Sequence, residues 1–362
     1  MNFTTPASGR SDMTLLDSLS SWYSNCHGYI SLIICAIGIP LNIINVVVLT
    51  RRKMHTPINF ILTCLAISDM ATMITYVPFA YHFYCEYSAN TISTGKNSFE
   101  WMNFLLIHLN FSATAHTISI WLAVALAMIR FHQIHSPAKG NLTRMRRIIR
   151  ARMIVGIIVV FSVTIMIPNY LSVKLEQYRR RDNTTMYIFE EWHLGTDQAK
   201  PIKMIALILY SVLAKLVPCV MIIIYGGLLL RTLRKTMLHQ RHLSSTGACL
   251  NPQRSNDPAR TTTMLLIVIV LFLLTELPQG ILIMCCIFIK NFFEKTYIPL
   301  GDIMDIIALI NNGINFVLYC TMSREFRLTF IDVFCSPLLK IEKPNSHAST
   351  VICHKKLQNS TL

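Results

Sequence analysis

Three charged side chains interrupt long apolar stretches of this sequence. Asp69, Lys215 and Glu276 each lie within a run of mainly apolar residues. An ionisable group in such surroundings is costly without a partner, and it usually serves a function. Lys215 lies three residues before Pro218. Glu276 lies two residues before Pro278, so the two charges should lie at a similar depth. We predict an ion pair between them; in the alternative, Glu276 is protonated and Lys215 donates to a backbone carbonyl.

The apolar stretches number seven, and they determine the fold class. Each approaches or exceeds the ~20 residues that an α-helix needs to cross ~30 Å of hydrocarbon. Hydrophobic residues make up 53% of the 362 residues and charged residues only 14%. The sequence therefore predicts an all-α membrane protein, a seven-transmembrane helix bundle with a short amphipathic eighth helix. The stretches are Gly28–Thr50, Ile58–Tyr84, Phe104–Met128, Ile154–Leu171, Ile202–Leu230, Met264–Ile289 and Ile303–Cys320.

The distribution of basic residues predicts the orientation of these spans. With the amino terminus outside, the cytoplasmic loops and tail hold 22 Lys and Arg against four acids, and the outer segments hold ten against twelve. This asymmetry follows the positive-inside rule. We expect a multi-pass plasma membrane protein with an extracellular amino terminus (1–27), a bundle (28–322), an eighth helix (323–335) and a cytoplasmic tail (336–362). The net charge of +15 is concentrated on one membrane face, so we expect no nucleic-acid partner.

Short motifs occur at matching depths in successive stretches. They are Gly38-Ile-Pro-Leu-Asn42, Leu65-Ala-Ile-Ser-Asp69, Arg130 with Pro137, Pro218, Phe272 with Pro278, and Asn315-Phe-Val-Leu-Tyr319. Together they resemble the rhodopsin-like (class A) G-protein-coupled receptors over about Cys26–Cys335. More narrowly, His116-Thr-Ile-Ser-Ile-Trp-Leu122 and Leu273-Leu-Thr-Glu-Leu-Pro-Gln-Gly280 resemble the invertebrate myosuppressin and FMRFamide-like peptide receptors.

The resemblance implies a receptor rather than an enzyme. It implies that an amidated neuropeptide binds outside and that heterotrimeric G proteins of the inhibitory class, and arrestin, bind inside. The residues implied in coupling and activation are Arg130, Tyr319, Asn315 and Phe272. No cofactor is required, but an allosteric sodium ion is implied at Asp69, Ser119, Asn311 and Asn315. The alternative at that site is a hydrogen-bonded network with water and no ion.

Some positions depart from the pattern of the broad family. Ile129 stands where the family has an acid, so Arg130 lacks the adjacent carboxylate that usually restrains it. Glu276 replaces the usual sixth-span Trp. No Cys occurs at Leu105 or in Ser172–Lys200, so the usual disulfide to the second outer loop is absent. Inactive-state restraints and the anchoring of the outer loop must therefore differ from those of the family.

A peptide ending in Arg-Phe-amide needs carboxylates for its guanidinium and aromatic side chains for its ring. Asp302 and Asp305 open the seventh span three residues apart, on one helix face. Asp305 lies deeper and is the strongest candidate, whereas solvated charge at the rim is the alternative for outer acids. Glu276 can instead meet the guanidinium directly. The other candidates for ligand binding are Lys215, His116, Tyr81, Glu86 and Trp192.

Two other classes of function compete with a peptide receptor. The nearer one is a rhodopsin-like receptor for a non-peptide or chemosensory ligand. A membrane transporter, with Asp69, Lys215 and Glu276 as an ion relay, is less favoured because the seven spans show no paired repeats. An enzyme is not expected, since the sequence contains no His-Glu-x-x-His, Gly-x-Ser-x-Gly or phosphate-loop motif.

Several expectations concern the two membrane surfaces. Cys26 and Cys85 should both lie near the outer rim, either joined by a disulfide or as free thiols. Asn2 and Asn183 begin outer Asn-x-Thr sequons and are candidates for glycosylation. The basic inner loops should also attract anionic lipid of the bilayer. The final Ser360-Thr-Leu362 fits a ligand of a PDZ protein.

Cys335 is predicted to carry a palmitate. It follows Phe330, the end of the amphipathic run, by five residues, so an acyl chain there can reach the bilayer. We expect hydroxylamine-sensitive acylation of the receptor that disappears in Cys335→Ser. Acylation that persists unchanged in this variant, or that is absent from the native chain, would show Cys335 to be a plain thiol.

Overall fold

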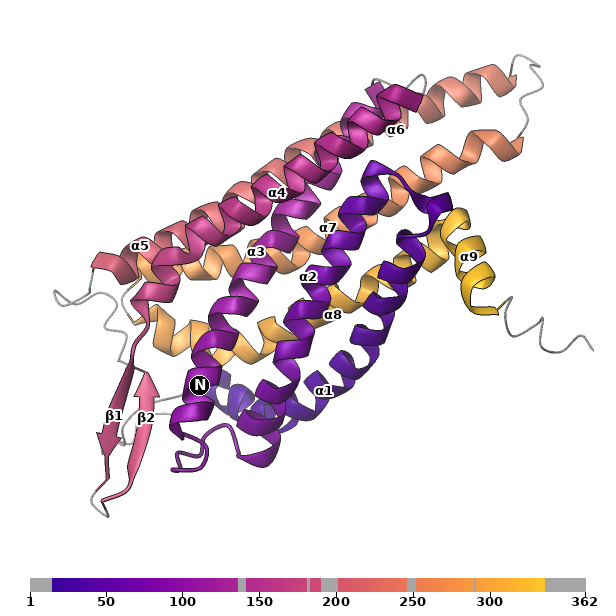
Figure 1. Ribbon diagram of the computed structural model, residues 1–362. Coiled ribbons are helices and arrows are strands. Elements are labelled where there is room, and N and C mark those ends of the chain that lie inside the picture. The colour runs from indigo at the N-terminus through magenta and orange to yellow at the C-terminus, as the bar shows by residue number, and fades with distance from the viewer. Residues whose placement is uncertain are drawn as a thin grey trace, which may run out of the picture.

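The computed structural model describes residues 15–135, 141–180, 183–189, 201–245, 252–289 and 291–335. Seven helical spans in these ranges are long and apolar enough to cross a membrane, and they pack as one bundle (Figure 1). The predicted fold class is therefore confirmed. The spans are Ser18–Leu49, Pro57–Glu86, Phe99–His135, Leu142–Ser172, Pro201–Thr232, Val270–Phe288 and Lys295–Thr321.

The helices differ from the apolar stretches mainly at their ends. The first helix begins at Leu15, well before the apolar stretch that starts at Gly28. It therefore includes the mixed polar and apolar residues up to His27. Three of the spans contain a π-helical segment. The α-helices are α1 (Leu15–Leu49), α2 (Pro57–Ala80), α3 (Phe99–His135), α4 (Asn141–Ser172), α5 (Pro201–Leu209), α6 (Val217–Ser245), α7 (Pro252–Phe288), α8 (Ile298–Met322) and α9 (Arg324–Phe330). A 3-10 turn η1 (Arg52–Met54) and the π-helical segments η2 (Tyr81–Glu86), η3 (Tyr210–Leu216), η4 (Phe293–Tyr297) and η5 (Ile331–Cys335) complete the helical elements of the described chain.

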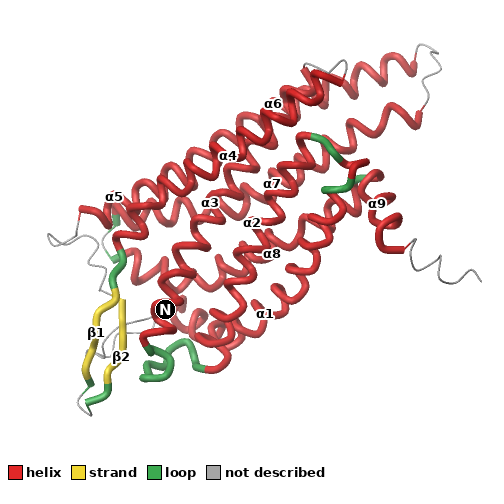
Figure 2. The backbone as a smooth tube through the Cα atoms, in the orientation of Figure 1, coloured by secondary structure: helices red, strands yellow, loops and turns green. Residues whose placement is uncertain are grey.

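A β-hairpin lies at the end of the bundle where α3 begins, which we call the outer end (Figure 2). Its strands, β1 (Leu175–Arg179) and β2 (Thr185–Phe189), pair antiparallel. Two hydrogen bonds hold it to the loop before α3: the backbone N–H of Tyr187 donates to the Asn97 carbonyl at 2.9 Å, and Asn97 Nδ2 donates to the Tyr187 carbonyl at 3.3 Å. These bonds anchor the hairpin in the absence of the usual disulfide.

The Cys26–Cys85 disulfide is not formed, which corrects that expectation in favour of two free thiols. Cys26 lies on the exposed face of α1. The Sγ atom of Cys85 instead packs against Gly28, 2.8 Å from the position that a Cβ would take there. The two side chains therefore face different surroundings although both lie at the outer end.

The eighth helix lies at the opposite end of the bundle, which we call the inner end (Figure 1). The Ser323 hydroxyl caps α9 by accepting a hydrogen bond from the backbone N–H of Phe326 at 3.2 Å. The Phe326 ring is buried, and its centroid lies 5.6 Å from that of Tyr319 on α8. An ion pair of 3.0 Å between Lys53 and Asp332 joins the first inner loop to η5. Cys335 is the last described residue of this segment.

Gly28 is predicted to be essential for the packing of α1 against the outer end of α2. A Cβ at Gly28 would lie 2.7 Å from the Tyr84 Cβ and 3.2 Å from the Ala80 carbonyl oxygen, and the backbone cannot move away easily. Overpacking costs about 1–3 kcal/mol. We therefore expect Gly28→Val to lower the Tm of the detergent-solubilised receptor by several degrees. The control is Gly156→Val on α4, where no atom lies within 4 Å of the added Cβ; equal losses in both variants would contradict the prediction.

Candidate functional site

The predicted ion pair is present in the centre of the bundle. Lys215 Nζ in η3 lies 2.6 Å from Glu276 Oε2 on α7, and both side chains are almost fully buried. His116 on α3 is the third member, with Nε2 2.9 Å from Oε1 and 3.0 Å from Oε2 of Glu276. The carboxylate is thus shared by groups from two other spans. Three spans that are far apart in the sequence are joined at one residue.

The remaining contacts of Lys215 come from neighbouring side chains. Its ammonium donates to Gln279 Oε1 at 2.8 Å and lies 5.6 Å from the centroid of the Tyr210 ring, which adds a cation–π contact. Gln279 and Tyr297 both line the same cavity next to this site. Lys215 therefore has partners in addition to Glu276, as a buried cation requires.

The two acids at the start of the seventh span are held by tyrosines of the second span, Tyr76 on α2 and Tyr84 in η2. The Tyr76 hydroxyl donates to Asp305 Oδ2 at 3.2 Å, and the Tyr84 hydroxyl donates to Asp302 Oδ1 at 2.6 Å. His27 on α1 extends this network, with Nε2 2.9 Å from the Tyr76 hydroxyl. Within the described residues, Oδ1 of Asp305 accepts no hydrogen bond, so it is available to a ligand.

A cavity of about 190 Å³ lies between the acids and the buried ion pair. We refer to it as the acidic cavity. Asp305 lies on one of its walls and His116 and Gln279 on others, so it brings together residues from both polar groups. His108 also lines it; this side chain is 2% exposed and its Nδ1 has no hydrogen-bond partner in the described chain. The arrangement can bind a cationic group that carries several hydrogen-bond donors.

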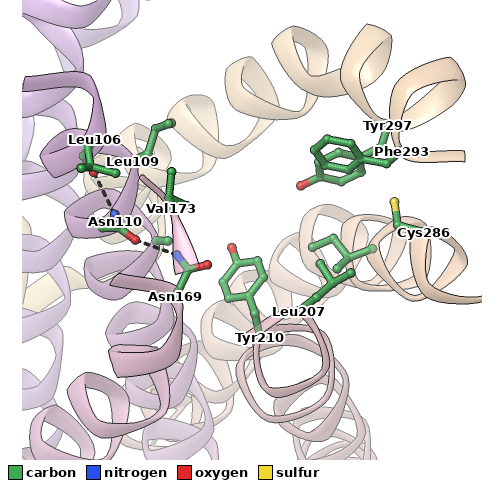
Figure 3. A pocket seen from close by; sticks show the side chains of 12 residues that line it. Leu106, Leu109, Asn110, Asn169, Val173, Leu207, Tyr210, Cys286, Phe293 and Tyr297 are labelled. Atoms are coloured by element: carbon green, nitrogen blue, oxygen red, sulfur yellow. Dashed lines mark hydrogen bonds between the residues drawn. The ribbon is translucent and has the colours of Figure 1, made fainter. Parts of the chain in front are cut away.

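A second cavity of about 270 Å³ adjoins the first (Figure 3). Asn110 and Asn169 lie on one side of it, joined by a hydrogen bond of 2.8 Å, and Phe293, Tyr297 and Cys286 lie on the other. Its remaining wall residues are mainly aliphatic. The two cavities share Leu109, Ala113, Tyr210 and Tyr297 as wall residues.

The residues proposed for sodium are only partly brought together. Asp69 Oδ1 accepts from the Ser119 hydroxyl at 2.9 Å, and Oδ2 accepts from Asn315 Nδ2 at 3.0 Å. Asn311 forms no hydrogen bond with them, because its neighbour Asn312 takes the buried position on α8. A carboxylate and a hydroxyl oxygen still form a donor set that suits a hard cation.

The residues proposed for coupling lie at the inner half of the bundle. Arg130 has a buried Nε with no hydrogen-bond partner in the part of the chain described, as the absence of an acid at Ile129 predicts. Tyr319 is 2% exposed and packs against α9. Phe272 is buried in an apolar cluster formed by α3, α6 and α7. Tyr319 and Phe272 are therefore both buried in the packing of the helices in this structure.

Other residues proposed for ligand binding lie elsewhere. Tyr81 is 56% exposed on η2 and does not line either cavity. Glu86 pairs with His82 Nδ1 at 2.8 Å and does not line either cavity. Trp192 and the sequon residue Asn2 lie outside the described residues. Asn183 is exposed in the hairpin turn, where a glycan has room.

Sequence reasoning missed several neutral residues of the site. Tyr76 lies seven residues after Asp69, which is two helical turns along one face, and that spacing could have identified it. Gln279 follows Glu276 by three residues and lies on the same face. By contrast, nothing in the sequence connects His27 to Tyr76, since the contact joins two different spans.

Comparison with known proteins identifies the family. The family model for the serpentine type 7TM GPCR chemoreceptor Srw matches residues 29–337. The chain therefore belongs to this family, and it is a rhodopsin-like G-protein-coupled receptor rather than an enzyme. Squid rhodopsin has a similar fold, with a TM-score of 0.63 and 13% sequence identity over 94% of this chain and 92% of that structure.

Several curated receptors are similar along most of the chain. The chain is 29% identical to the G-protein-coupled receptor dmsr-1 of Caenorhabditis elegans over 88% of this chain and 69% of that protein. It is 25% identical to the sex peptide receptor of Drosophila melanogaster, over 92% of this chain and 80% of that receptor. It is 21% identical to the FMRFamide receptor of Drosophila melanogaster, over 86% of this chain and about half, 54%, of that receptor.

The ion pair generates a prediction about coupled substitutions. Removing one partner of a buried pair leaves a charge that costs about 3–5 kcal/mol, so Lys215→Ala and Glu276→Ala should each impair surface expression and signalling. The swap of Lys215→Glu with Glu276→Lys should recover only part of the loss, because His116 then faces an ammonium instead of a carboxylate. Surface labelling and second-messenger responses measure these effects. A double Ala variant whose loss equals the sum of the single losses would show that the residues do not interact.

Proposed function

We propose that this receptor binds an amidated neuropeptide of the FMRFamide-like or myosuppressin type and signals through inhibitory heterotrimeric G proteins. The observation that carries the proposal is the Asp305 carboxylate on the wall of a cavity at the outer half of the bundle, with Oδ1 available. A guanidinium there gains a charge-assisted hydrogen bond in surroundings of low polarity. The Arg of an Arg-Phe-amide peptide supplies such a group.

The names of similar receptors support a peptide ligand. One is a sex peptide receptor and another an FMRFamide receptor, and both match along most of this chain. A second candidate, a small chemosensory ligand, is favoured by the description of the family as chemoreceptors. The two candidates differ in the need for a cation: a peptide with Arg requires the charge of Asp305, whereas a neutral odorant does not.

The inner half supports the proposed partners. We place the amino terminus outside and the tail in the cytoplasm of a plasma membrane receptor. Arg130 then lies at the cytoplasmic end of α3, with basic inner loops beside it. Opening of this end would expose Arg130 and Tyr319 to a G protein and afterwards to arrestin. Collapse of a sodium site at Asp69 and Ser119 would favour the open state, and Cys335 and the final Leu362 remain proposed contacts with lipid and a PDZ protein.

The proposed function predicts a charge-specific response to peptides. In cells, an Arg-Phe-amide peptide should lower cyclic AMP in a pertussis-toxin-sensitive manner, and its free-acid form should be much weaker. Asp305→Asn should reduce the potency of the amidated peptide by about 10–100-fold, since hydrogen bonds to charged groups contribute about 1.5–3 kcal/mol. The same variant should change the potency of a peptide with citrulline in place of Arg far less.

The control for this experiment is Glu86→Gln, which neutralises an outer acid that pairs with His82 and does not line the acidic cavity. It should leave the ratio of the two potencies unchanged. Equal effects of Asp305→Asn on the Arg and citrulline peptides would show that Asp305 does not bind the guanidinium. A receptor that responds to no amidated peptide but does respond to small neutral compounds would support the chemosensory alternative.

A further inference from the structure

We propose that the second cavity is an apolar compartment that binds the aromatic side chain next to the basic residue of the peptide. This inference rests on the proposed function and assigns a second subsite to it. The compartment lies between α3, α4, η3, α7 and η4 (Figure 3). Its occupant is an uncharged ring, of the size of a phenyl group or slightly larger.

The size of the compartment fits a ring. Its volume is about 270 Å³, whereas an apolar cavity of ~150 Å³ is already sufficient to bind benzene. None of its described wall residues carries a charge. The Phe293 and Tyr297 rings stack on the wall with centroids 5.5 Å apart and an angle of 18° between them. A further ring can therefore pack against an edge or face of this pair.

The polar groups of the compartment exclude a charged occupant. Asn110 Nδ2 donates to the Leu106 carbonyl at 2.9 Å, and Asn110 Oδ1 accepts from Asn169 at 2.8 Å. Both polar ends of the Asn110 amide are thus engaged, and no described wall residue is charged, so the wall offers no compensating charge to an ammonium or a carboxylate. An ion transferred there loses its hydration without a partner. An aromatic ring has no such penalty and gains contact area.

The two cavities together define a ligand with two adjacent side chains. The acidic cavity, at about 190 Å³, is smaller than the ~300–1,000 Å³ typical of a site for a drug-sized ligand. A ligand larger than one side chain must therefore extend beyond it. Tyr210 and Tyr297 belong to the walls of both cavities, so the apolar compartment is the adjoining space for this extension. A basic residue next to an aromatic residue fits these two adjoining cavities.

A test that enlarges the compartment distinguishes it from the acidic cavity. Ile283 is 2% exposed and lines only the apolar compartment, whereas Leu309, also 2% exposed, lines only the acidic cavity. The measured quantity is the potency of a peptide with naphthylalanine-amide relative to that of the phenylalanine-amide peptide. Ile283→Ala should raise this ratio roughly 10-fold, the effect typical of fitting one or two carbons in an apolar pocket. Leu309→Ala should leave the ratio unchanged.

Because the result is a ratio within one variant, reduced expression does not affect it. An increase in Leu309→Ala alone would place the ring in the acidic cavity and overturn the proposal. An unchanged ratio in both variants would overturn it as well. In either case, the proposed peptide function stands if Asp305→Asn lowers the potency of the Arg peptide more than that of the citrulline peptide.

A binding measurement tests the compartment without signalling. The purified receptor is heated with millimolar N-acetylphenylalaninamide or, as a control, N-acetylglycinamide, which lacks the ring. The aromatic probe should raise the Tm and the control should not, because a ligand that binds only the folded state stabilises it. Equal Tm values with the two probes would overturn the compartment. A higher Tm with the aromatic probe, in a receptor that no amidated peptide activates, would support the compartment and reject the peptide function.

Discussion

The buried pair of Lys215 and Glu276 is the constraint on which the outer half of this receptor depends. Neither charge is stable in the bundle without the other, because the free-energy cost of desolvating a charge exceeds the stabilisation that neutral neighbours provide. His116 also contacts Glu276, and Gln279 accepts a hydrogen bond from Lys215, so η3, α3 and α7 must meet at this depth. The acidic cavity is the space left on the outer side of that meeting point. A ligand that moves Gln279 or Tyr210, which both line the cavity and contact Lys215, changes the partners of Lys215, and this is a physical route from the cavity to the packing of α7.

The π-helical segments place the outer side chains. Lys215 itself lies in η3, and η2 and η4 lie at the outer ends of their spans. A π-helical turn holds more residues than an α-helical turn, so it rotates the side chains that follow it, and such turns are frequent at functional sites. Tyr81 begins η2 and is exposed, whereas Tyr84 later in the same segment reaches Asp302. Phe293 and Tyr297 in η4 both line the apolar compartment.

The sequence predicted those features that depend on a single helix. Apolar length defined the spans, the prolines placed Lys215 level with Glu276, and the three-residue spacing placed Asp302 and Asp305 on one face. Features that depend on the rotation or contact of two helices were not predictable in this way. Tyr81 was a candidate as an aromatic residue at the end of the second span, and the sequence does not show that this end is the π-helical segment η2, where Tyr81 is exposed. Likewise, Cys26 and Cys85 lie at a similar depth and yet face different surroundings, which spacing along each helix does not report.

The charges of the described spans support the proposed cationic ligand. Glu276 has a cation, Lys215, as its partner, whereas three other acids of the spans accept hydrogen bonds from neutral groups. Asp69 is held by Ser119 and Asn315, and Asp302 and Asp305 are held by tyrosines. Neutral donors supply no compensating positive charge, and electrostatic interactions are strong where water is largely excluded. Asp305 is the acid of this group that lines the acidic cavity. A guanidinium that enters the cavity supplies the charge that the bundle itself does not, while the adjacent ring enters surroundings that admit no charge.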